Sequence, residues 1–217
     1  MKNVDLVIFD CDGVLVDSER ITNTVFAEML NELGLSLTLE DMFEQFVGHS
    51  MSYCLELSEK LLQRPVPNNF EKEFHERSAI AYQTSLQPVP GIVDLLQGLE
   101  IPYCVASNST HQEMQVTLGI TQLLNYFEGK RFSVADVARG KPYPDVYLYA
   151  AKQMSVVPNR CVVIEDTAIG VRAAVSAGMR VFGYAKLTPA HQLEEEGAIS
   201  FTDMQRFIEL LSNLSLS

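Results

Sequence analysis

The sequence contains few basic residues. Among its 217 residues, 16 are Lys or Arg and 28 are Asp or Glu, which gives a formal net charge of −12. Nucleic acids and anionic membranes both favour basic surfaces, so this charge argues against either as a partner. An anionic substrate would therefore have to be attracted locally, by a metal ion and a few well-placed cations.

Other features are missing as well. The four cysteines form no CxxC pair and have no metal-ligand spacing, and a buried cysteine behaves as a small hydrophobic residue. No apolar run approaches the length of a membrane span, and no signal-peptide pattern, internal repeat or low-complexity segment is present. With 47% hydrophobic and 20% charged residues, the chain is expected to be a soluble cytoplasmic enzyme. No apolar seam stands out, so we expect a monomer.

The first apolar run ends in two aspartates. Residues 4–9 predict a short buried strand, and Asp10 and Asp12 follow it directly, before Gly13. In an open α/β sheet, ligands bind at the carboxyl ends of strands. Burying two unpaired carboxylates is costly, so the pair predicts a cation or a shared chemical task, with one acid as nucleophile and Mg²⁺ ligand and the other transferring protons. The alternative is a solvated Asp-x-Asp-Gly turn.

The hydrophobic period changes along the chain. Residues 15–86 show only helical patterns, whereas from residue 87 onwards predicted strands alternate with helices. This alternation indicates a parallel sheet with right-handed crossovers. We therefore predict an α/β fold with a Rossmann-like core, formed by residues 1–14 and 87–217. A helical cap domain, residues 15–86, is inserted after the first strand, where it can act as a lid.

Polar residues also follow the later strands. Ser107 and Asn108 end one predicted strand, Glu165 and Asp166 end another, and Lys141 precedes a helix. In a parallel sheet these ends share one edge, so the side chains can converge with the first two aspartates. Four converging carboxylates repel one another without a counter-charge, which Mg²⁺ can provide. Ser107 and Lys141 are then a donor and a cation for phosphate oxygens.

Each of these residues has a plainer interpretation when taken alone. Ser107 could cap a helix, Lys141 could be a solvated surface lysine, and the Glu165–Asp166 pair could complement a helix dipole. Only their occurrence together favours a site.

The motifs resemble those of a known family. The sequences Asp-x-Asp-Gly-Val-Leu-Val-Asp-Ser-Glu, Ser-Asn, Gly-Lys-Pro-x-Pro-Asp and Glu-Asp-(x)3-Gly occur in the order and spacing of the haloacid dehalogenase-like (HAD-like) hydrolases. Over essentially its whole length, the chain resembles the subfamily that includes β-phosphoglucomutase and small-sugar phosphatases, phosphogluconate phosphatase-like proteins in particular.

The resemblance implies a Mg²⁺-dependent phosphatase that hydrolyses small phosphate monoesters, such as sugar phosphates or phosphosugar acids, through an aspartyl-phosphate. It makes Asp10 the nucleophile and Asp12 the general acid and base. The implied phosphate-binding residues are Ser107, Asn108 and Lys141. The implied metal ligands are Asp10, Asp12 through its backbone carbonyl, Asp166, and Glu165 directly or through water.

The sequence of the predicted cap bears on substrate specificity and on whether the phosphoryl group is transferred to water or to a second sugar hydroxyl. His49 and Arg77 are the candidate substrate-specificity residues of the cap, although an ordinary turn residue is the plainer interpretation of His49 and an exposed helix arginine beside Glu76 that of Arg77. Mutases of the subfamily carry a histidine early in the first cap helix and an arginine in the cap's glycine turn. Residues 20–22 and 48–51 match neither feature, which favours transfer to water, although His49 keeps a phosphosugar mutase possible. A different alternative is an inactive protein that binds phosphorylated metabolites.

Overall fold

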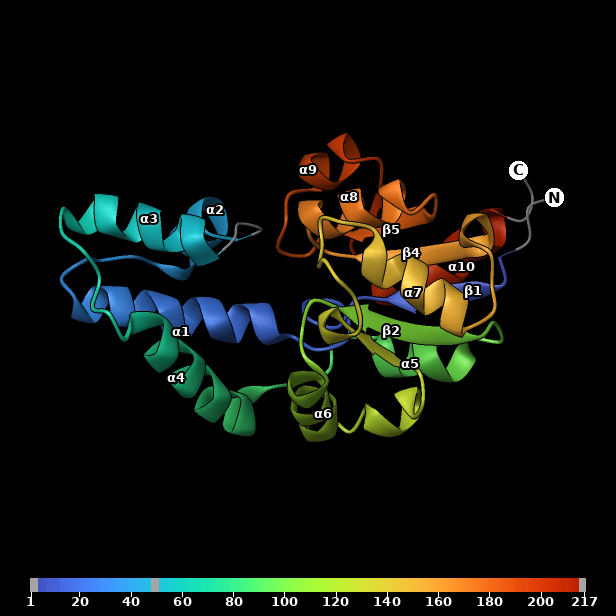
Figure 1. Cartoon of the computed structure of the whole chain (residues 1–217), viewed down its shortest axis with the longest axis horizontal. Helices are drawn as coiled ribbons and strands as arrows, with labels where there is room; N and C mark the ends of the chain where they lie inside the picture. The colour runs from blue at the N-terminus through green and yellow to red at the C-terminus, as the bar shows by residue number, and fades with distance from the viewer. Residues whose placement is uncertain (1–3, 48–50, 215–217) are drawn as a thin grey trace. The chain divides into compact units, whose positions relative to one another are not determined.

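The computed structural model describes residues 4–47 and 51–214, which divide into two compact units (Figure 1). Ser18–Leu86 form a helical unit, and the described residues on either side of it form an α/β unit. The helical pattern of the sequence assigns residues 15–17 to the insertion. They belong to the α/β unit, because Val16 pairs through isolated β-bridges with Asp12 and Pro88.

The α/β unit is built on a six-stranded sheet in the order β3-β2-β1-β4-β5-β6, and every neighbouring pair is parallel. The predicted parallel sheet is therefore confirmed. The strands are β1 (Leu6–Phe9), β2 (Tyr103–Ser107), β3 (Arg131–Ser133), β4 (Cys161–Glu165), β5 (Arg180–Tyr184) and β6 (Ile199–Phe201). The first strand lies inside the sheet, between β2 and β4, so its carboxyl end is flanked by theirs.

Helices cover both faces of this sheet (Figure 1). On one face, alternate strand residues such as Ile8 and Val163 pack against a buried apolar cluster from three helices. On the other face, Phe9 contacts Phe127, and Phe182 contacts Phe207. The helices of the unit are α5 (Ile92–Gly98), α6 (His111–Ile120), α7 (Asp145–Gln153), α8 (Ala168–Ser176), α9 (Ala190–Glu195) and α10 (Phe207–Leu214). The apolar cluster of the first face comes from α7, α8 and α9.

The helical unit has a core of its own. Its helices are α1 (Ser18–Glu32), α2 (Leu39–Gln45), α3 (Met51–Leu62) and α4 (Phe70–Ser85). The buried ring of Phe26 on α1 lies 5.2–5.7 Å, between ring centroids, from those of Phe46, Phe70 and Phe74. These aromatic contacts join α1 to α4 and to the end of α2.

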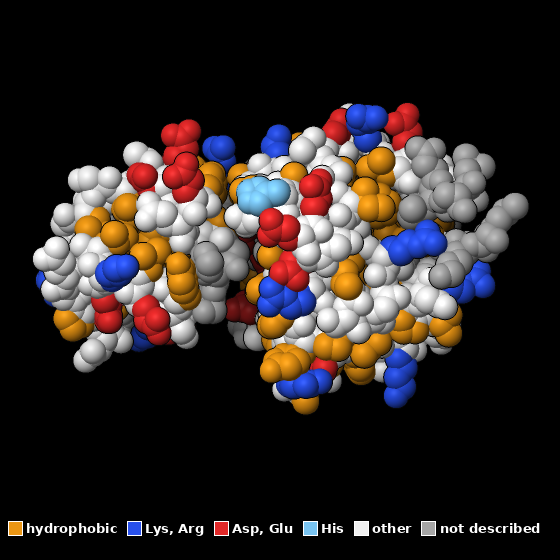
Figure 2. All heavy atoms as spheres, turned by 90° about the horizontal axis from the view of Figure 1, so that it is seen from above, with side chains coloured by type: hydrophobic (Ala, Val, Ile, Leu, Met, Phe, Trp, Pro, Cys, Tyr) orange, Lys and Arg blue, Asp and Glu red, His pale blue; other side chains and the backbone are white. Residues whose placement is uncertain are grey.

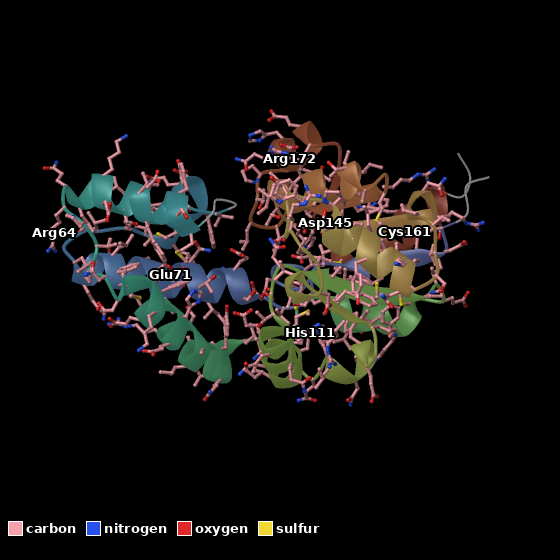
Figure 3. All side chains as sticks on the ribbon, in the orientation of Figure 1. Arg64, Glu71, His111, Asp145, Cys161 and Arg172 are labelled. Carbon is pink, nitrogen blue, oxygen red and sulfur yellow. The ribbon has the colours of Figure 1, made fainter. Side chains whose placement is uncertain are left out.

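The surface mixes charges of both signs. On the face in Figure 2, acidic and basic side chains of the α/β unit lie next to one another. Surface ion pairs include Arg139–Asp145, and Asp145 is labelled at the start of α7 in Figure 3. Within the described ranges, no helix has both the length and the apolar character needed to cross a membrane. All four cysteines are buried and free.

The aromatic cluster predicts where the helical unit is most sensitive to substitution. Phe26→Ala should lower its free energy of unfolding by about 3–5 kcal/mol, because a buried ring that touches three others leaves a cavity. Ile80→Ala on α4 is the control, since Ile80 is 67% exposed and its loss should change stability by less than about 0.5 kcal/mol. Chemical denaturation, with hydrogen exchange of the amides in α1 and α4, measures both. Equal effects of the two substitutions would contradict this account of the core.

Candidate active site

The carboxyl ends of three neighbouring strands bring most of the predicted residues together. Asp10 follows β1, and its backbone amide donates to the carbonyl of Ile164 in β4 over 3.0 Å. Ser107 is the last residue of β2 and Glu165 the last of β4. Because β1 pairs with both strands, these three residues lie on one edge of the sheet. All three are buried.

Lys141 supplies the cation of this edge. Its side chain is only 4% exposed, and Nζ donates to Asp10 Oδ1 and to Glu165 Oε1, each over 2.6 Å. Burial disfavours the charge on Lys141, but the two carboxylates outweigh burial and raise the pKa of the ammonium above its ordinary value. Lys141 is therefore a charged, buried bridge between β1 and β4, and not a solvated surface lysine.

Glu165 is held by donors on both oxygens. Oε1 accepts from Lys141 Nζ and, over 2.8 Å, from the hydroxyl of Tyr147. Oε2 accepts from the next two backbone amides and from the Thr167 hydroxyl, each over 3.0 Å. Burial opposes ionisation, but Lys141 and these donors together lower the pKa of Glu165. Protein groups thus use both oxygens, and a role of Glu165 as metal ligand stays a prediction.

Asp10 differs from Glu165 although both bind the same lysine. Burial raises the pKa of Asp10 to about 7, Lys141 opposes this rise, and the nearby charges of Glu165 and Asp12 add to it. Of the five donors that stabilise the Glu165 carboxylate, Asp10 shares only Lys141. A second positive charge beside Asp10 would favour its ionised form.

A cation fits the donor set at this position. Oxygen atoms of Asp10, Glu165 and Asp166 all lie within 4.8 Å of one another, and all three residues are buried. Carboxylate oxygens are the ligands that Mg²⁺ prefers. Gly13 makes the approach possible, since a Cβ there would lie 1.9 Å from Asp166 Oδ2 and its φ is +75°. The arrangement can therefore hold a divalent cation, although the Asp12 side chain is not part of the group.

Asp12 instead contacts a residue that sequence reasoning missed. Its Oδ2 accepts a hydrogen bond of 2.7 Å from the Ser109 hydroxyl, which comes from the loop after β2. The backbone carbonyl of Ser109 accepts from Ser133 Oγ over 2.7 Å, which fixes that loop against β3. The sequence does contain a signal for Ser109, because the polar run that begins at Ser107 continues beyond the end of the strand.

Asn108 holds the lysine loop. Its Oδ1 accepts from the backbone amide of Lys141 over 2.8 Å, and its Nδ2 donates to the carbonyl of the same residue over 3.3 Å. Gly140 allows this close approach, because a Cβ there would lie 2.8 Å from Asn108 Oδ1. In the structure Asn108 therefore positions Lys141 through its backbone, and a direct phosphate contact stays a prediction. Ser107 Oγ accepts from the backbone amide of Ser109 over 3.0 Å, so its hydroxyl hydrogen can point to a ligand.

Of the two predicted cap residues, the structure describes only Arg77. His49 lies outside the described residues. Arg77, on α4 of the helical unit, donates to both oxygens of Glu32, over 2.6 and 2.9 Å, and to Glu73. These carboxylates raise the pKa of Arg77 above its ordinary value. Arg77 thus joins α1 to α4, and its role in substrate specificity stays a prediction.

One glycine pair tests how tightly Glu165 is held. Gly170→Ala on α8 would place a Cβ 1.8 Å from Glu165 Oε1, so it should destabilise the protein by at least about 2 kcal/mol. Gly119→Ala on α6 is the matched control, since no atom lies within 4 Å of its Cβ position, and it should be neutral or stabilising by up to about 1 kcal/mol. Urea unfolding measures both. Similar results for the two variants would show that Glu165 can move at little cost.

Comparisons with known proteins agree with this geometry. A haloacid dehalogenase-like hydrolase family model matches residues 4–178. The 6-phosphogluconate phosphatase of Escherichia coli (strain K12) is 32% identical over 212 residues, covering 97% of this chain and 96% of that protein. The phosphorylated carbohydrates phosphatase of Thermotoga maritima is 30% identical over 217 residues, covering 97% and 100%. A solved haloacid dehalogenase-like protein from Agrobacterium tumefaciens has a TM-score of 0.93 at 32% identity, covering 98% of this chain and all of that one. Motifs, fold and site thus agree, and the chain belongs to the haloacid dehalogenase-like hydrolases.

Proposed function

We propose that this protein is a Mg²⁺-dependent phosphatase of small phosphate monoesters, with sugar phosphates or phosphosugar acids as substrates. The observation that carries the proposal is the buried Lys141 ammonium, which lies 2.6 Å from the Asp10 carboxylate at a strand end. A carboxylate beside a fixed cation can attack a dianionic phosphoryl group, because the cation offsets the repulsion between them. The relatives named above as phosphatases of 6-phosphogluconate and of phosphorylated carbohydrates support the substrate class.

The first half of the reaction assigns one role to each aspartate. An oxygen of Asp10 forms a bond to phosphorus while the bond from phosphorus to the ester oxygen breaks, which leaves Asp10 phosphorylated. Asp12 donates its proton to the leaving oxygen. The hydrogen bond from Ser109 to Asp12 Oδ2 keeps that carboxyl oriented.

The second half reverses the proton transfer. Asp12 takes a proton from a water molecule, whose oxygen attacks phosphorus and displaces Asp10. Ser107 and Lys141 bind the phosphoryl oxygens in both halves. When bound by Asp10, Asp166, the carbonyl of Asp12 and, directly or through water, Glu165, Mg²⁺ supplies further positive charge against those oxygens. The four buried free thiols fit a reducing compartment, so we propose a cytoplasmic location.

A panel of phosphate monoesters tests the activity. With Mg²⁺ present, released phosphate should be highest for sugar phosphates or phosphosugar acids, and a chelator should abolish turnover until Mg²⁺ is restored. Asp10→Asn should reduce kcat by more than about 10³-fold, because it removes the nucleophile at nearly constant volume. Asp94→Asn, an exposed acid in α5, is the control and should retain full turnover. A folded Asp10→Asn variant with most of its turnover would refute the covalent route.

The leaving group tests the role of Asp12. Asp12→Asn should slow a sugar phosphate by about 10²–10⁴-fold, because its alkoxide leaving group needs a proton. An activated aryl phosphate should lose much less, since an aryl oxide leaves without one. The amide oxygen of Asn can still accept from Ser109, so the loop geometry is retained. Equal losses for both esters, at saturating Mg²⁺, would exclude Asp12 as the proton donor.

A further inference from the structure

Tyr147 contacts both Lys141 and Glu165. The sequence alone does not predict a role for this tyrosine. It is fully buried on α7. Its hydroxyl donates to Glu165 Oε1 over 2.8 Å, and its ring face lies 4.8 Å from Lys141 Nζ. One side chain thus contacts both the lysine and the carboxylate that binds the lysine.

We infer that Tyr147 is a positioning residue that fixes the Lys141 ammonium for phosphoryl transfer. The inference rests on the proposed function, which gives Lys141 its role. Tyr147 acts through two contacts, its hydroxyl on Glu165 Oε1 and its ring under Nζ. It need not touch the substrate.

The hydroxyl contact restricts where Glu165 Oε1 can be. A buried phenol needs an acceptor, and the Glu165 carboxylate provides one for the Tyr147 hydroxyl. Oε1 accepts from both Tyr147 and Lys141 Nζ. Two donors on one oxygen leave it little freedom to rotate. Oε2 is fixed by the backbone amides after β4, so both oxygens of the Glu165 carboxylate are held in place. The carboxylate therefore binds the Lys141 ammonium in one position.

The ring contact places Lys141 Nζ against α7, a helix that is packed into the apolar core. Lys141 itself lies in the loop before α7, whereas Tyr147 lies within the helix. Val146 and Ala150 on the same helix are fully buried in the apolar core of the sheet. An ammonium over an aromatic face is attracted by the electron density of the ring. The position of Nζ is therefore set by α7 and β4, and not by the loop alone.

Tyr147→Phe removes the hydroxyl and retains the ring. Without the hydroxyl, Glu165 Oε1 and the Lys141 ammonium that it binds are less precisely placed, so kcat should fall by about tenfold or more. Because Lys141 acts on the phosphoryl group that all esters share, the loss should be the same for every ester, with KM changed less than about threefold. Tyr149→Phe is the matched control on the same helix, where the ring of Tyr149 packs edge-on against Phe132. It should keep kcat within about twofold of the parent protein.

A second measurement reads the lysine directly and needs no turnover. In ¹⁵N-lysine-labelled protein, the ammonium signal of Lys141 is identified by its loss in Lys141→Met. Its hydrogen exchange should be slow in the parent protein and in Tyr149→Phe, and several-fold faster in Tyr147→Phe.

The outcomes separate the two proposals. A uniform loss of kcat in Tyr147→Phe together with faster ammonium exchange supports the positioning role. A kcat within twofold of the parent, an ester-selective loss or an unchanged exchange rate overturns it, as does a fall in thermal stability with kcat preserved. If the parent protein hydrolyses no ester of the panel, the proposed function fails. Ammonium exchange then decides alone whether Tyr147 positions Lys141.

Discussion

The buried ion pairs of Lys141 hold the candidate site together. One ammonium, almost inaccessible to solvent, bonds at 2.6 Å to Asp10 after β1 and to Glu165 at the end of β4. Removing one member of a buried ion pair leaves an uncompensated charge, which costs several kcal/mol. Each neighbour that holds Lys141 or Glu165 in place therefore contributes to stability and to the arrangement of the reactive groups. Mg²⁺ chemistry at Asp10 and Asp166 would build on this pre-formed cluster.

One asparagine side chain and two glycines allow this arrangement of Lys141 and the carboxylates. Asn108 binds both the amide and the carbonyl of Lys141 and so fixes the loop that carries it. Gly13 and Gly170 leave room for the carboxylates of Asp166 and Glu165, at places where any Cβ would overlap them. These are local requirements of strand ends and helix starts, and they explain why glycine recurs beside the acidic residues of the motifs.

Sequence reasoning located the strand ends because buried strands of a parallel sheet are short apolar runs, and the polar residues after them are conspicuous. It therefore predicted Asp10 and Glu165 at strand ends, and it added Lys141, which precedes a helix, because of the other polar residues; the structure brings these three side chains together. It missed Ser109 and Tyr147, since a hydroxyl after a strand and a tyrosine on an apolar helix face look the same whether or not they bond to an acid. It also missed β6 (Ile199–Phe201). The start of the insertion was placed three residues early, because the pairing of Val16 with Asp12 and Pro88 is not visible in the local sequence.

The central claim is that Asp10, held by Lys141, becomes phosphorylated during turnover. Its most direct test is rapid acid quench of the enzyme with a ³²P-labelled sugar phosphate and Mg²⁺, followed by peptide mapping of the protein. We predict a transient, acid-stable acyl phosphate on the peptide that contains Asp10, which forms and decays at rates that account for steady-state turnover. Turnover with no label on the protein at any time, or with label at another residue, would contradict the account.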